Sequence, residues 1–170
     1  MTKKYRFLIA VTIPLLILLA MMIKPQATVL FGQEIVLESK AFDPTDLFRG
    51  DYVAISFAIS EIPKSKVTLP IDKINNKNLY VSLKQEGKYY VVDQVSEMKP
   101  KQGVYLKGKF QANYNEFNQA DKLTVDYSLD KYFIGQGSGV NLQQKSYRGG
   151  LVGTVKVLGG YGVVTAIAPI

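Results

Sequence analysis

Three aspartates, Asp43, Asp46 and Asp51, stand close together and are the strongest candidates for chemistry in this chain. Clustered carboxylates suit Ca²⁺ or Mg²⁺, and a pair of them suits acid–base hydrolysis. Their spacing fits no standard cation-binding loop. Asp43 is better placed to cap a helical turn that begins at Pro44, and Asp51 or Asp46 to pair with Arg49. We therefore expect no metal site and no catalytic residue here.

Two residue types that often serve in catalysis, as a nucleophile or as a proton acceptor, are missing. The chain has no cysteine and no histidine, which removes thiol nucleophiles, disulfides, most zinc sites and the usual neutral-pH base. The glycines at 135, 137 and 139 lack the strand–helix setting and the lysine of a phosphate-binding loop, so we interpret them as a tight loop. We expect a protein that is not an enzyme and has no cofactor. The alternative is a cell-envelope hydrolase or ligand-binding protein that uses Asp46 and Asp51.

The element that places everything else is an uncharged apolar run, Phe7–Ile23. As a helix it spans roughly 25 Å, near the short end of what crosses a bilayer. Basic residues at positions 3, 4 and 6 precede it and favour a cytoplasmic N-terminus. No small-x-small pattern ends the run, so an uncleaved anchor is favoured over a cleaved signal peptide. The sequence predicts a single-pass protein of the cell membrane, with a basic tail (1–6), an anchor in the lipid bilayer (7–23) and an outward domain (28–170).

Charge excludes one class of partner. The formal net charge is +7, from 21 basic and 14 acidic residues. Four of the basic residues flank the apolar run, which leaves 17 against 14 for the rest of the chain. No basic stripe remains to follow a phosphate backbone, so we expect no nucleic-acid partner.

Beyond residue 27, short alternating runs with turn signals between them predict strands. An exit segment (27–31) comes first and an irregular loop covers 61–78. Gly87 and the Gly159-Gly160 pair mark hairpins, and Gly108 marks a bulge. In Tyr52–Ile59 the expected core face is Val53, Ile55, Phe57 and Ile59. The pattern favours a mainly β domain, a sandwich or partly open barrel, with one or two short helical turns. The predicted strands are 33–40, 52–59, 79–84, 88–98, 104–112, 123–129, 151–158 and 162–168.

The stretch from Gly50 to Phe57, GDYVAISF, resembles the Gly-Asp-Tyr-x-x-Leu-x-Tyr signature of the bacterial GDYXXLXY protein family. Ile55 stands where the signature has leucine, and Phe57 where it has tyrosine. The resemblance implies a small membrane-anchored protein of unestablished function, whose genes often adjoin those of polytopic membrane proteins, and hence a membrane-protein partner. The residues that match are Asp43, Pro44, Asp46, Leu47, Arg49, Gly50, Asp51 and Tyr52 in and before the signature, and Tyr132, Phe133, Gly137 and Gly139 in a second segment.

A weaker similarity links the chain to the β scaffold of type I signal peptidases. Their nucleophilic serine falls on Ala41 here, so the hydroxyl is missing. No lysine can be assigned as the base, and acyl transfer needs both groups. This similarity therefore implies a related scaffold without that activity.

Overall fold

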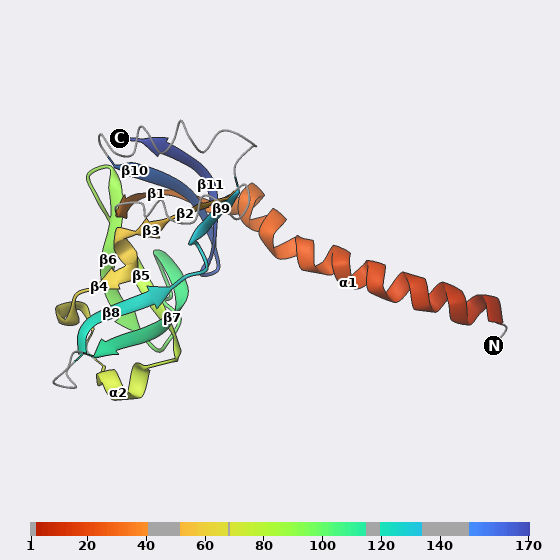
Figure 1. Cartoon of the computed structure of the whole chain (residues 1–170), viewed down its shortest axis with the longest axis horizontal. Helices are drawn as coiled ribbons and strands as arrows, with labels where there is room; N and C mark the ends of the chain where they lie inside the picture. Colours follow the sequence, from red (N-terminus) through yellow and green to blue (C-terminus); the bar gives the residue numbers. More distant parts are fainter. Residues whose placement is uncertain (1–2, 41–51, 68, 115–119, 134–149) are drawn as a thin grey trace.

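The computed structural model describes residues 3–40, 52–67, 69–114, 120–133 and 150–170. One long helix, α1 (Lys3–Phe31), projects from the side of a β domain that holds the rest of the described chain (Figure 1). The sheets curve into a half barrel and a nearly closed barrel, which confirms the prediction of a mainly β domain with a barrel-like form. α1 is long and apolar enough to cross a membrane, although a signal sequence would have the same appearance.

The first sheet has four strands in the order β11-β10-β1-β3, all antiparallel. At its centre, Ile35 and Leu37 are buried whereas Glu34 and Glu38 are exposed, as the alternation predicts. Gly159 and Gly160 have φ angles of 59° and 85°, and glycine adopts this left-handed conformation at little cost, which closes the last hairpin. The strands are β1 (Gln33–Lys40), β3 (Ser56–Phe57), β10 (Leu151–Leu158) and β11 (Tyr161–Pro169).

The second sheet has five strands in the order β4-β8-β7-β5-β6. Gly87, with a φ of 60°, supplies the predicted hairpin turn between β5 and β6. A third sheet consists of two short strands, β2 (Tyr52–Ala54) and β9 (Lys131–Phe133). The strands of the five-stranded sheet are β4 (Glu61–Ile62), β5 (Asn78–Glu86), β6 (Tyr89–Ser96), β7 (Val104–Tyr114) and β8 (Ala120–Asp126).

A single hydrophobic core joins both large sheets. Leu37 and Val155 come from the four-stranded sheet, Val81 and Phe110 from the five-stranded one, and all four are nearly inaccessible to solvent. A core of this size lets a domain without disulfides remain folded, because apolar burial is the dominant favourable term in folding.

The structure corrects the sequence-based elements in six places. The strand predicted at 123–129 is β8, which ends at Asp126, and β9 was not predicted. Residues 27–31 continue α1 and are not a separate exit segment. Tyr52–Ile59 is not one strand but β2, β3 and the start of a 3₁₀ turn, η2 (Ala58–Ser60). The irregular loop 61–78 contains β4, another 3₁₀ turn, η3 (Lys64–Lys66), and one turn of α-helix, α2 (Ile71–Ile74).

Gly108 is the last correction, because the pairing of β5 with β7 runs through it without a bulge. Its role is close packing: a Cβ there would overlap Val125 and lie 2.8 Å from the Tyr127 ring. The glycine therefore lets two strands and a buried aromatic ring approach, which its place in the sequence did not reveal.

Candidate functional site

The two segments singled out in the sequence, around Tyr52 and around Tyr132, meet in space. β2 and β9 pair antiparallel, with Tyr52 opposite Phe133 and Val53 opposite Tyr132. These residues are 81 and 79 positions apart in the chain. On β9, the Tyr132 hydroxyl donates a hydrogen bond to the carbonyl oxygen of Thr165 on β11, 3.3 Å away. The small sheet is thereby tied to the edge of the four-stranded sheet.

Tyr52–Phe57, hereafter the crossover, changes partners in the middle. β2 pairs with β9, whereas β3 pairs with β1 through Phe57 opposite Ser39. Between them, the backbone N–H of Ile55 donates to the carbonyl oxygen of Asp130, at 2.8 Å. The Ile55 side chain is 5% exposed. The crossover thus connects the two-stranded sheet to the four-stranded sheet.

Phe57 is the packing centre of the crossover. Its side chain is 1% exposed, and its ring lies over Gly153 of β10. A Cβ at Gly153 would lie 2.5 Å from Phe57 Cε1, so the ring occupies the space that a side chain would need. The ring at position 57 and the glycine at position 153 are therefore complementary.

A hollow of about 280 Å³ lies beside the crossover and is bounded by Ile55, Phe57 and the C-terminal end of β8. Asp126 and Asp130 bring two carboxylates to its lining. Asp126 Oδ1 accepts a hydrogen bond from the backbone N–H of Ser128 at 2.7 Å, and Ser128 has a φ of 58°. An aspartate that caps a tight turn in this way has a structural task already.

Tyr127 lines this hollow and is almost fully buried. Its hydroxyl donates to the carbonyl oxygen of Ile59 at 3.1 Å. Burial raises the pKa of Tyr127 far above the ordinary value of a tyrosine, because a phenolate would lose its hydration there. The hydroxyl is therefore a fixed, neutral hydrogen-bond donor and is not a base at neutral pH.

Several of the predicted site residues lie outside the described residues: Asp43, Pro44, Asp46, Leu47, Arg49, Gly50, Asp51, Gly137 and Gly139. The proposed cap at Asp43, the acidic turn and the glycine loop consequently stay predictions. Among the residues that the structure describes, no group of three or more His, Cys, Asp or Glu side chains is arranged to hold a metal ion.

Comparison with known proteins identifies the family of this chain. A family model described as GDYXXLXY protein matches residues 14–167. The chain belongs to this family. The search of the curated proteins and the search of the solved structures found no match.

The GDYXXLXY signature now has a structural meaning at three of its positions. Its tyrosine, Tyr52, starts β2; its leucine position, Ile55, lies at the change of sheet; and its last aromatic position, Phe57, is in the core. The described part of the signature, 52–57, is therefore a folding element. The second segment of the family resemblance, at Tyr132 and Phe133, is the strand that pairs with it.

Sequence reasoning did not find the hollow or its two aspartates. Asp126 ends β8 and Asp130 precedes β9, so each appears in the sequence as an ordinary polar residue at a strand end. A signal was present in the short segment that separates two β-runs, because turns at strand ends often carry aspartate. That signal predicts a turn and does not indicate which distant strand lies against it.

Proposed function

We propose that this protein is a membrane-anchored accessory domain that docks onto a polytopic membrane protein in the same bilayer and catalyses no reaction of its own. In this proposal Phe7–Ile23 crosses the cell membrane, the N-terminus is cytoplasmic and the β domain lies outside. The observation that carries the proposal is the direct junction between a helix whose apolar part is uncovered by the described residues and a folded β domain.

The apolar part of α1 supports the first half of the proposal. Its most apolar 18-residue window is entirely exposed within the chain, so no described part of the protein covers it. Residues such as Leu16 and Leu19 are more than half exposed. Apolar surface of this extent is unfavourable in water and favourable in lipid. Basic side chains at Lys3 and Lys4 favour a cytoplasmic start.

The other end of α1 supports an anchor that is retained. Thr28 is completely buried, and its Oγ1 donates to the carbonyl oxygen of Lys24 at 2.9 Å. The last turns of α1 pack on β10 and β11. The backbone N–H of Gly32 donates to the carbonyl oxygen of Thr28 at 2.8 Å, and β1 begins at the next residue. Removal of the helix would take buried contacts from the β domain.

The chemistry of the described residues supports an interaction role. The hollow at the crossover offers two aspartates, and Asp126 already caps a turn. A hydrolytic mechanism needs a nucleophile or an activated water with a base beside it. Binding through surfaces needs none of these groups. The family resemblance, with its genes beside those of polytopic proteins, adds a reason to look for the partner in the membrane.

The test has two steps on the full chain in its own membranes. First, alkaline extraction and N-terminal sequencing of the mature protein should find it in the membrane fraction with its helix retained. Second, an affinity tag at the C-terminus should recover the same membrane protein from repeated mild solubilisations, at a constant ratio. Release by alkali, a cleaved N-terminus or recovery of the protein always alone would contradict the proposal.

A further inference from the structure

A second hollow lies where α1 meets the β domain, and we refer to it as the junction hollow. Its volume is about 420 Å³, which exceeds that of the hollow beside the crossover. Its walls come from α1, from the middle of β7, from the start of β5 and the end of β8, and from the β10–β11 turn with the start of β11. The residues used below are Lys24, Lys107, Lys109, Asp126, Gly159 and Tyr161.

The junction hollow is basic. Three lysines, Lys24, Lys107 and Lys109, border it, against the single carboxylate of Asp126. Lys109 is the register partner of Asp126, and Asp126 Oδ1 also accepts a hydrogen bond from Ser128. Within the described part of the chain, no ion pair engages any of the three lysines. The excess of two positive charges is therefore open to an anion.

The walls of the junction hollow are fixed in place. The β10–β11 turn is held on β7, where the backbone N–H of Lys107 donates to the carbonyl oxygen of Gly160 at 2.8 Å. A Cβ at Gly160 would lie 2.8 Å from the Tyr105 ring, so this turn is in close contact with the strand. Nothing lies within 4 Å of a Cβ built at Gly159. The turn thus forms a rigid wall beside open space.

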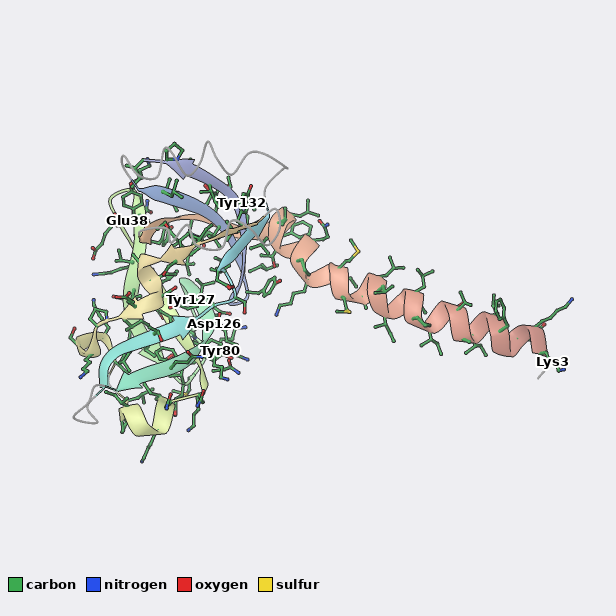
Figure 2. All side chains as sticks on the ribbon, viewed as in Figure 1. Lys3, Glu38, Tyr80, Asp126, Tyr127 and Tyr132 are labelled. Atoms are coloured by element: carbon green, nitrogen blue, oxygen red, sulfur yellow. The ribbon has the colours of Figure 1, made fainter. Side chains whose placement is uncertain are left out.

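The position of Lys24 relates the hollow to the bilayer. Lys24 is the first charged residue after the apolar run Phe7–Ile23. Its Nζ lies 4.3 Å from the ring centroid of Tyr161, a cation–π contact that joins the helix to the β10–β11 turn. If the run spans the hydrocarbon core, Lys24 and Tyr161 lie at the level of the headgroups, where lysine and tyrosine are favoured. Figure 2 shows Asp126 and Tyr80 on the side of the domain from which α1 leaves.

From these observations we propose that the junction hollow binds the phosphate group of an anionic phospholipid, in the leaflet on the side of the β domain. Lys24 reaches the headgroup from the helix, and Lys107 and Lys109 reach it from β7. Basic pockets at this depth attract anionic headgroups, and the attraction is short-ranged because salt screens it. The inference rests on the membrane-spanning part of the proposed function. It does not depend on a protein partner.

The experiment uses the full chain, purified in an uncharged detergent and mixed with equal amounts of phosphatidylglycerol and phosphatidylcholine. Native mass spectrometry measures the ratio of the two lipid adducts. The wild-type protein should prefer phosphatidylglycerol. In Lys107→Gln/Lys109→Gln the preference should fall about fivefold for each lysine removed, the scale on which one basic side chain contributes near an anionic bilayer.

Lys64→Gln/Lys73→Gln is the matched control, because it removes the same charge from exposed lysines on η3 and α2, outside the hollow. The control should keep the wild-type lipid preference, and thermal unfolding should be the same for all three proteins. Equal loss in both double variants would overturn the proposal in favour of a general charge effect. An unchanged preference in Lys107→Gln/Lys109→Gln would also overturn it.

Two further arms separate the source of the phosphate and the proposed function. Inorganic phosphate, added at millimolar concentration, should displace phosphatidylglycerol only weakly. Full displacement, together with equal binding of the two lipids, would overturn the lipid assignment in favour of a soluble phosphate ligand. Membrane extraction and partner recovery are measured on separate samples, so loss of the partner with an intact lipid preference would count against the accessory role alone.

Discussion

β5 and β6 pair at seven positions, with one register shift between Ser82 and Leu83, whereas the crossover pairs with β9 at three positions and with β1 at two. Both regions alternate buried and more exposed side chains, along β5 and from Ile55 to Phe57. The hairpin is closed by a glycine with the φ that its turn requires, at Gly87. The crossover has no turn of its own and is held by contacts with residues far away in the chain. The first region is specified by its own sequence, and the second by residues such as Gly153 and Asp130.

Phe57→Ala should have the largest effect on stability, because it removes a ring that is 1% exposed from the centre of the crossover. We expect a loss of about 3–5 kcal/mol in the free energy of unfolding. Urea unfolding of the full chain in an uncharged detergent measures it. Phe31→Ala is the matched control, because that ring is 76% exposed. Equal losses in the two variants would remove the distinction between crossover and surface.

Gly153→Ala tests whether the Phe57 ring and Gly153 are complementary. Alone it should destabilise the fold by about 1–3 kcal/mol, because the added methyl group would meet the Phe57 ring. In the Phe57→Ala background the space is empty, so the same methyl group should cost much less. A double-mutant cycle gives the coupling between the two sites. Strict additivity would show that Phe57 and Gly153 are not complementary.

Tyr127→Phe should have a smaller effect. It removes the donor to the carbonyl oxygen of Ile59, 3.1 Å away, and keeps the ring. We expect a loss of about 1 kcal/mol, the usual net value of one buried hydrogen bond. Thermal unfolding of the full chain at neutral pH measures it. Tyr89→Phe, in the half-exposed start of β6, serves as the control and should change the midpoint little.

The same variant carries a prediction about pH. Burial raises the pKa of Tyr127 in the folded protein above its ordinary value of 10.0, so the unfolded state releases the proton first. The contribution of Tyr127 is therefore fully present below about pH 10 and is lost as the pH rises above it. Wild-type stability should fall more steeply above pH 10 than that of Tyr127→Phe. Parallel curves would contradict the assignment of a buried, neutral hydroxyl.

Lys84→Gln should have the smallest effect. Lys84 Nζ lies 2.8 Å from Glu86 Oε1 near the hairpin tip, and both side chains are about half exposed. A hydrogen bond and charge attraction between them raise the pKa of Lys84 and lower the pKa of Glu86. Water and salt screen such a pair, so the unfolding midpoint should not change measurably at 0.15 M salt. A clear loss would show that the hairpin depends on more than its turn and apolar face.

The sequence was sufficient where the deciding residues are neighbours. Gly87 and the Gly159-Gly160 pair determine their turns locally, and the burial of Ile35 and Leu37 follows from alternation within β1. Across 52–59, alternation correctly placed Ile55, Phe57 and Ile59 in the core. Alternation could not predict the break between β2 and β3. The break depends on a hydrogen bond from the backbone N–H of Ile55 to the carbonyl oxygen of Asp130, which lies 75 positions later in the chain.

Neither of the two hollows could be predicted from the sequence, and the reason is the same. The junction hollow collects Lys24, Lys107 and Lys109 from an N-terminal helix and a central strand. These lysines were counted in the charge balance as ordinary basic residues, since no spacing rule connects them. Only the packing of α1 on the closing hairpin brings them to one place.

The single glycine between α1 and β1 has a mechanical consequence. A Cβ at Gly32 would overlap the carbonyl oxygen of Thr28, so the chain turns there without a flexible spacer. One residue therefore joins the end of α1 at Phe31 to the start of β1 at Gln33. Membrane helices tilt by about 20° on average, so in the proposed membrane-spanning arrangement a change in tilt would also change the orientation of the attached domain. In that arrangement, a mismatch between the apolar run and the bilayer thickness, which helices accommodate in part by tilting, would influence which face of the domain a neighbouring protein meets.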